Sequence, residues 1–192
     1  AERVRSFDRA NLEGFVAQHY GPGQMILSAA GAVDHDEIVR LAEAAFGHLP
    51  ASPVSQADPG RFRGGERREV KQLEQAHFTL ALEAPGYRSD NIYTAQIYAT
   101  ALGGGMSSRL FQELRERRGL CYTIYSQVGS YADTGLMTIY AGTGEEDLAG
   151  LADLTIEEVR RSVDSLSQAE IDRARAQMKA GMLMGLESPS AR

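Results

Sequence analysis

Apolar positions in the first 48 residues predict a helix, a strand and a second helix. Residues 8–20 place their apolar side chains on one helical face, and Asp8 can cap the start of this helix, which we expect to lie on a core. Residues 25–33 form a nearly continuous apolar run, typical of a strand buried on both faces. Asp34 and Glu37 form a capping box for a helix that reaches Phe46. These elements make one helix–strand–helix unit.

The pattern disappears between residues 49 and 68. This segment contains prolines, glycines, serines and charges without an apolar period, which is typical of a linker. A length of about 20 residues is long for a loop within one domain and favours a connection between two structural halves. We therefore expect residues 1–48 to end one half and residues 69–192 to form most of another, truncated at its C-terminus.

The second part alternates between strand and helix patterns. Residues 70–83 show a strand alternation, and residues 90–102 form an apolar helix. A short charged helix, a two-stranded hairpin over residues 121–141, and amphipathic helices over 145–163 and 167–186 follow. Ser167 and Glu170 form a capping box for the last of them. This order predicts an α+β fold with a largely antiparallel β-sheet and helices packed on one face.

Three consecutive glycines, Gly103, Gly104 and Gly105, interrupt the helix pattern. They can form a tight helix-to-helix turn, which is the interpretation we favour, or a flexible loop that contacts substrate. An anion-binding module is a third possibility and predicts nucleotide affinity. It is the weakest, because the glycines fit no phosphate-binding spacing and no strand leads into them.

A cation and a phenol flank the end of the charged helix. Arg115 follows Phe111 by one turn and emerges at the margin of a buried stripe, and Tyr122 lies just past a glycine stop at Gly119. Helix and strand can therefore aim Arg115 and Tyr122 at one spot. The hairpin alternation places Tyr122 on the face of Ile124, whereas Cys121 faces the other way as a packed thiol. Alternatively, Arg115 only pairs with Glu116 or another surface carboxylate, and Tyr122 belongs to the core.

Two segments resemble a known family. GGGMSSRLFQELRERRGLCYTIYS and SYADTGLMTIYAGT are similar to the second half of the inverzincin zinc proteases, the insulinase and mitochondrial-processing-peptidase family. The similarity extends to FDRANLEGFVAQHYGPGQMILSAAGAVDHDEIVRLAEAAF and to the final LESPSAR, so it covers nearly the whole chain. It implies a LuxS/MPP-like half within a clamshell of two related halves. It also implies that Arg115 and Tyr122 match an arginine–tyrosine pair that reaches the substrate.

The chain departs from that family in its histidines. In the family, the first half holds zinc on an H-x-x-E-H helix, but His19, His35, His48 and His77 belong to no such motif here. We therefore expect a fragment of a zinc metalloendopeptidase that binds peptide while the zinc site lies upstream. The intact parent would use zinc, and the isolated chain would bind none and be inactive. A non-catalytic scaffold subunit of the same family is the alternative.

Composition narrows the expected partners. The net charge is −6 and no basic stripe is present, so we expect no nucleic acid partner. No apolar run approaches the roughly 20 residues that span a bilayer, and a single cysteine fits the cytoplasm. The expected partners are the N-terminal catalytic half of the same protein and a peptide or unfolded polypeptide substrate. A second copy of the chain is a further candidate.

Overall fold

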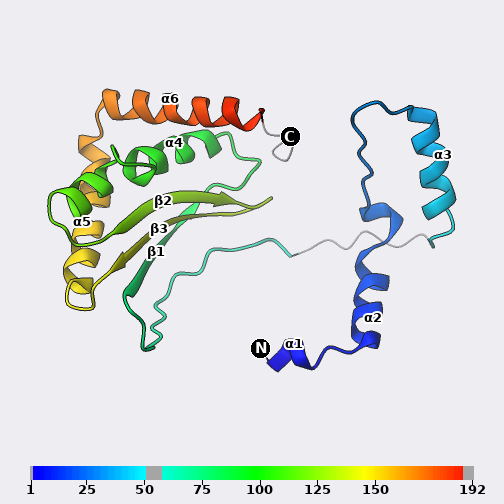
Figure 1. Cartoon of the computed structure of the whole chain (residues 1–192), viewed down its shortest axis with the longest axis horizontal. Coiled ribbons are helices and arrows are strands. Elements are labelled where there is room, and N and C mark those ends of the chain that lie inside the picture. The colour runs from blue at the N-terminus through cyan, green and yellow to red at the C-terminus, as the bar shows by residue number, and fades with distance from the viewer. Residues whose placement is uncertain (1, 51–57, 188–192) are drawn as a thin grey trace. The chain divides into compact units, whose positions relative to one another are not determined.

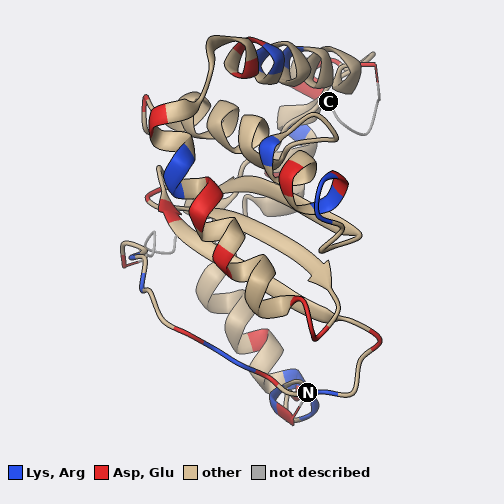
Figure 2. Cartoon of the chain, turned by 90° about the vertical axis from the view of Figure 1, so that its left-hand side faces the viewer, with Lys and Arg blue, Asp and Glu red and all other residues tan. Residues whose placement is uncertain are grey.

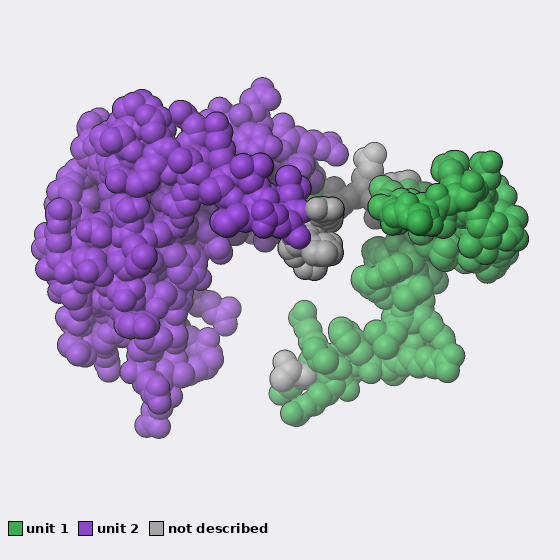
Figure 3. Space-filling view, turned by 45° about the horizontal axis from the view of Figure 1, so that its top comes forward, with its two compact units in different colours: residues 1–58 green, residues 59–192 purple. Residues whose placement is uncertain are grey.

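The computed structural model describes residues 2–50 and 58–187. The chain divides into two compact units, residues 1–58 and residues 59–192 (Figure 3). Each unit has its own internal packing.

The first unit contains short helices, and the two longer ones begin where the sequence predicts caps. They are α1 (Glu2–Arg5), α2 (Arg9–His19), the 3-10 turn η1 (Pro22–Gln24) and α3 (His35–Phe46) (Figure 1). Asp8 caps α2 by accepting a hydrogen bond of 2.8 Å from the backbone N–H of Asn11, and Asp34 caps α3 by accepting one of 2.9 Å from the N–H of Glu37. The two predicted helix starts are thus confirmed. The capping box expected of Asp34 and Glu37 is only half formed, because the Glu37 carboxylate accepts hydrogen bonds from Arg40 instead of from the backbone N–H of Asp34.

Two predictions for this unit are wrong. The described residues 25–33 form no strand, and Ile26 in this run is 93% exposed. The apolar face of α2 does not lie on a core either, since Phe15 and Val16 are more than half exposed. The shared physical reason is that a strand needs a partner strand and an apolar helix face needs a surface to cover. The described residues of this unit supply neither.

The second unit is built on a three-stranded antiparallel sheet. Its strands are β1 (Ala76–Ala84), β2 (Thr123–Ser130) and β3 (Gly135–Thr143), in the order β1-β3-β2. Ile139 of the central strand is opposite Leu80 on one side and Ser126 on the other. The predicted hairpin is the β2–β3 pair. The strand expected over residues 70–83 starts later, because residues 70–75 do not join the ladder.

Four helical segments accompany the sheet. They are α4 (Ile92–Gly103), η2 (Phe111–Glu116), α5 (Leu148–Ser165) and α6 (Gln168–Gly185). Helix α4 lies between the sheet and α6 (Figure 1). Ser167 and Glu170 form the predicted capping box of α6, in which each side chain accepts a hydrogen bond from the other residue's backbone N–H. The fold class is α+β with helices on one face of an antiparallel sheet, as predicted.

The core is made between that face and the helices. The central strand contributes Met137, Ile139 and Ala141, while α4, η2 and α5 contribute Leu102, Leu114 and Leu151, all buried. The alternation of strand residues determines which side chains enter this core. The buried stripe of α5 includes three polar residues, Thr155, Glu158 and Ser162. Val163, which the sequence pattern placed on the apolar face, is 78% exposed.

The opposite face of the sheet carries ring side chains. His77, Tyr140 and Tyr125 stand side by side across the three strands, and Nδ1 of His77 lies 2.8 Å from the hydroxyl of Tyr140. Strands β2 and β3 contain no Lys, Arg, Asp or Glu, and charged residues lie mainly on helices and loops (Figure 2). Among the helices of residues 2–50 and 58–187, none combines the length and apolar character that a membrane crossing requires.

Candidate functional site

The short charged helix that the sequence predicts before Gly119 is a π-helix. Residues Phe111–Glu116 are wound so that the backbone N–H of Arg117 donates to the carbonyl of Gln112, five residues earlier, at 3.0 Å. Such wide turns are rare and occur often at functional sites. Leu110 and Leu114, four residues apart, are both fully buried. The segment ends at Gly119, whose φ of +65° is the left-handed conformation predicted for this position.

Arg115 and Tyr122 meet at the end of this helix, as the sequence predicts. The Cζ atom of Arg115 lies 4.9 Å from the ring centroid of Tyr122 and 4.6 Å from that of Phe111. These distances are within the range of cation–π contact. The Arg115 Nε atom is 3.8 Å from a carboxylate oxygen of Glu116, so the pairing that we considered as the alternative is present but long.

The exposure of Tyr122 differs from the hairpin prediction. Its side chain is 78% exposed, whereas Ile124 and Cys121 are buried. Strand β2 begins only at Thr123, so its alternation does not extend back to Tyr122. Tyr122 is therefore not a core residue, and its hydroxyl can reach a ligand. Cys121 is buried, which confirms the packed thiol expected from the sequence, and this burial raises the pKa of its thiol.

The three glycines form a closely packed turn at the end of α4. A Cβ atom on Gly103 would lie only 2.6 Å from the backbone N of Ser126 on β2. The carbonyl of Gly104 accepts a hydrogen bond of 2.6 Å from Gln177 on α6, and the carbonyl of Gly105 accepts one of 2.6 Å from Ser108. This is the geometry of the helix-to-helix turn that we favoured. A role of Gly103, Gly104 and Gly105 in substrate contact stays a prediction.

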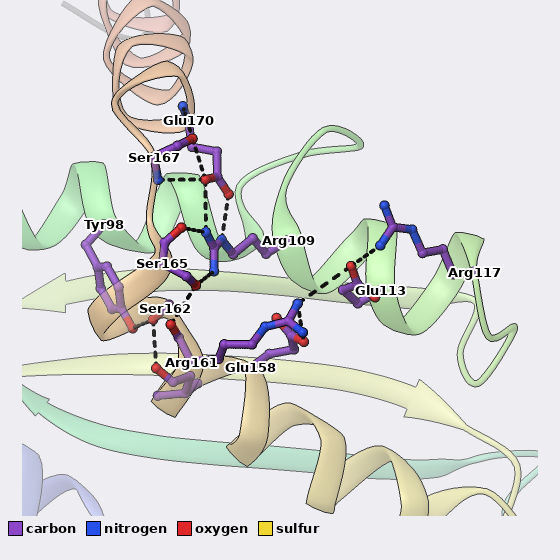
Figure 4. A network of polar contacts seen from close by, with 11 residues as sticks. Tyr98, Arg109, Glu113, Arg117, Glu158, Arg161, Ser162, Ser165, Ser167 and Glu170 are labelled. Atoms are coloured by element: carbon purple, nitrogen blue, oxygen red, sulfur yellow. Dashed lines mark hydrogen bonds and ion pairs between the residues drawn. The ribbon is translucent and has the colours of Figure 1, made fainter.

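A polar network joins the segment just before η2 to the start of α6 (Figure 4). The guanidinium of Arg109 donates to both carboxylate oxygens of Glu170, at 2.5 and 3.0 Å, and also to Ser165. Both partners are largely buried. The hydrogen bonds from Arg109, and secondarily from Ser167, lower the pKa of the Glu170 carboxyl to about 2, and the same bond raises the pKa of Arg109.

A second part of the network joins η2 to α5. Glu113 pairs with Arg117 and lies 3.9 Å from Arg161, which in turn contacts one carboxylate oxygen of Glu158 at 2.9 Å (Figure 4). Glu158 is only 2% exposed, and its Oε2 atom has no hydrogen-bond partner in the described part of the chain. Burial raises the pKa of this carboxyl. The buried Glu158 was not predicted, although its spacing of seven from Leu151 places it on the buried stripe of α5.

The histidines and carboxylates of the described residues do not form a metal site. Within residues 2–50 and 58–187, no group of three or more His, Cys, Asp or Glu side chains is arranged to hold a metal ion. His77 contacts Tyr140, and the ring of His19 packs against that of Phe15 with a centroid distance of 4.5 Å and an interplanar angle of 44°. These residues therefore do not fit zinc, and no chemical step in this chain is assigned to a metal.

Comparison of the sequence with known proteins identifies a family. The profile of the Peptidase M16 inactive domain matches residues 6–178. An uncharacterized zinc protease of Rickettsia bellii is 38% identical over 188 residues, which are 97% of this chain and 46% of that protein. The uncharacterized zinc protease YmxG of Bacillus subtilis is 32% identical over 100% of this chain and 47% of its own length. The chain thus spans about half the length of these relatives.

Solved structures show the same fold. A peptidase M16 inactive domain from Pseudomonas fluorescens superposes with a TM-score of 0.76 at 21% identity, covering 93% of this chain and 44% of that one. A chain of complex III2 from Candida albicans gives a TM-score of 0.86 at 24% identity, covering 99% of this chain and 48% of that one. The resemblance to zinc proteases is confirmed, and the chain belongs to the Peptidase M16 inactive domain family.

Proposed function

We propose that this chain forms the substrate-contacting half of a zinc metalloendopeptidase, with Arg115 and Tyr122 as its contacts to the reacting peptide. The observation that carries the proposal is the meeting of an exposed phenol and a guanidinium at one helix end. The family membership and the names of the relatives support a peptidase parent.

The two groups suit the chemistry of peptide hydrolysis. As a peptide carbonyl becomes tetrahedral, its oxygen gains negative charge, and hydrogen-bond donors aimed at that oxygen lower the barrier. A guanidinium donates through a rigid fork and keeps its charge, and a phenol donates one hydrogen bond. Within the described residues, the guanidinium of Arg115 donates no hydrogen bond, and its ion pair with Glu116 is 3.8 Å long, so its donors are available to a substrate.

The proposed active site also needs a zinc site, which would lie in the other half of the full-length protein. When bound there, zinc would supply an activated water. The N-terminal half of the same protein would be the partner, and a peptide or unfolded polypeptide the substrate. The isolated chain is then inactive, and we expect metal analysis of the purified chain to find substoichiometric zinc.

Turnover by the full-length protein tests the proposal. Arg115→Ala and Tyr122→Phe should each cost about 2–4 kcal/mol of transition-state stabilisation, a loss of roughly 30-fold to 1000-fold in kcat/KM. Arg118→Ala is the matched control, because Arg118 is exposed and makes no ion pair within the described part of the chain. Wild-type turnover in both test variants would remove the pair from the mechanism.

The same full-length protein distinguishes the alternative function. A parent without an H-x-x-E-H motif upstream of this chain, and without peptidase activity, would be a non-catalytic scaffold subunit. The fold shared with a chain of complex III2 is compatible with that outcome. The meeting of Arg115 and Tyr122 favours the catalytic parent, because a scaffold has no need for exposed donors at this position.

A further inference from the structure

We infer that Phe111 is a positioning residue that holds the Arg115 guanidinium between its own ring and the ring of Tyr122. The Cζ atom of Arg115 lies 4.6 Å from one ring centroid and 4.9 Å from the other. The contact itself is a property of this chain. Its consequence for turnover rests on the function proposed above.

No carboxylate performs this positioning. The contact of Arg115 with Glu116 is 3.8 Å long, and the Glu116 side chain is 52% exposed. An exposed pair of this length contributes little, because water screens it and both side chains lose rotamer freedom. The other arginines of this region differ: Arg109 and Arg117 hydrogen-bond to the carboxylates of Glu170 and Glu113. Arg115 therefore relies on its two aromatic neighbours.

The helix geometry explains why Phe111 is in position. Residues four apart are neighbours on a helix surface, and long side chains on a helix lie over the turn that precedes them. Arg115 is four residues after Phe111 within the π segment, so its side chain extends over the Phe111 ring. Phe111 is itself fixed because it packs against the hydrophobic core. It thus provides a rigid surface for the guanidinium, to which the exposed Tyr122 adds a second ring at 4.9 Å.

Two neutral rings have a chemical advantage over a carboxylate. A carboxylate would occupy the guanidinium N–H groups and cancel the positive charge that a carbonyl oxygen requires. Rings contact the flat faces of the guanidinium and leave the N–H groups at its edge free to donate. Phe111 thus orients Arg115 and preserves both its charge and its donors.

NMR spectroscopy of the 192-residue chain tests the contact without the remainder of the protein. We expect nuclear Overhauser contacts between the Phe111 ring protons and the Arg115 δ protons, and an upfield shift of the Arg115 Nε proton. Phe111→Leu should remove this shift and increase the mobility of the Arg115 side chain. Phe111→Tyr keeps the ring, so it should retain the shift and the restricted mobility. Absence of the Overhauser contacts in the wild-type chain would overturn the inference, even if Phe111→Leu failed to fold.

Kinetics of the full-length protein test the consequence. Loss of one cation–π contact predicts about a fivefold decrease in kcat/KM for Phe111→Leu and recovery in Phe111→Tyr. In an Arg115→Ala background, Phe111→Leu should cause no further decrease, because the group that it orients is gone. A full additional decrease there would show that Phe111 acts independently of Arg115. If Arg115→Ala alone retains wild-type turnover, the proposed function fails. The NMR experiment on the 192-residue chain still tests whether Phe111 holds the Arg115 guanidinium.

Discussion

Replacing Glu170 by glutamine should destabilise the second unit strongly at neutral pH and very little in acid. Glu170 accepts two hydrogen bonds from the guanidinium of Arg109, and its side chain is only 19% exposed. This pair fastens the segment before η2 to the start of α6, so it supports the helix that carries Arg115. The amide of glutamine cannot provide the charge that these bonds require.

The pKa of Glu170 sets the expected size of the effect. At about 1.4 kcal/mol for each pH unit, lowering the pKa from its ordinary 4.5 to about 2 corresponds to about 3 kcal/mol. Because the folded-state pKa is the lower one, this stability is fully present above pH 4.5 and is lost as the pH falls towards 2. A loss of about 3 kcal/mol should lower the urea midpoint by about 1–2 M at pH 7.

Urea unfolding, followed by the amide NMR signals of β3, measures this difference within the second unit. Wild-type and Glu170→Gln chains should differ at pH 7 and converge between pH 4.5 and pH 2. Glu83→Gln is the matched control, since Glu83 is exposed on β1 and should change the midpoint little. A difference that is equally large at pH 2.5 would show that packing is responsible, which would refute the assignment to charge.

Two further predictions concern other residues of the same unit. Burial raises the pKa of Glu158, so its ionised form costs stability as the pH rises above 4.5. Glu158→Gln should therefore gain stability relative to wild type as the pH rises from 4.5 to 7, and a difference in urea midpoint that stays constant across that range would contradict this. Gly103→Ala should destabilise by about 1–3 kcal/mol because its Cβ would meet the Ser126 backbone at 2.6 Å. Gly181→Ala in α6, which meets nothing within 4 Å, should instead stabilise by about 0.5–1 kcal/mol, and thermal unfolding of both variants checks the opposite signs.

Features that depend on residues close together in the chain were predicted correctly. The caps at Asp8, Asp34 and Ser167 each involve a backbone N–H three residues later. The left-handed Gly119 and the meeting of Arg115 with Tyr122 also follow from short spacings on either side of one helix end. Such contacts are specified locally, because the geometry of a few consecutive residues brings the groups together.

Features that depend on distant partners were not predictable in this way. The apolar run at residues 25–33 reads as a buried strand, but a strand forms only where another strand accepts its hydrogen bonds. The exposure of Tyr122 depends on where β2 begins to pair with β3, and the burial of Glu158 depends on η2 and the sheet covering that side of α5.

The sequence pattern alone indicated the helix starts after Asp8, Asp34 and Ser167, the antiparallel sheet, the family resemblance and the pair of residues at the candidate site. The completion of the contact around Arg115 by Phe111, the π winding of the helix and the buried ionic network that supports it followed only from the packing of distant segments. The physical reason is that spacing along the chain specifies which groups share a local surface. Burial, charge pairing and the winding of a helix depend on every segment that packs against it.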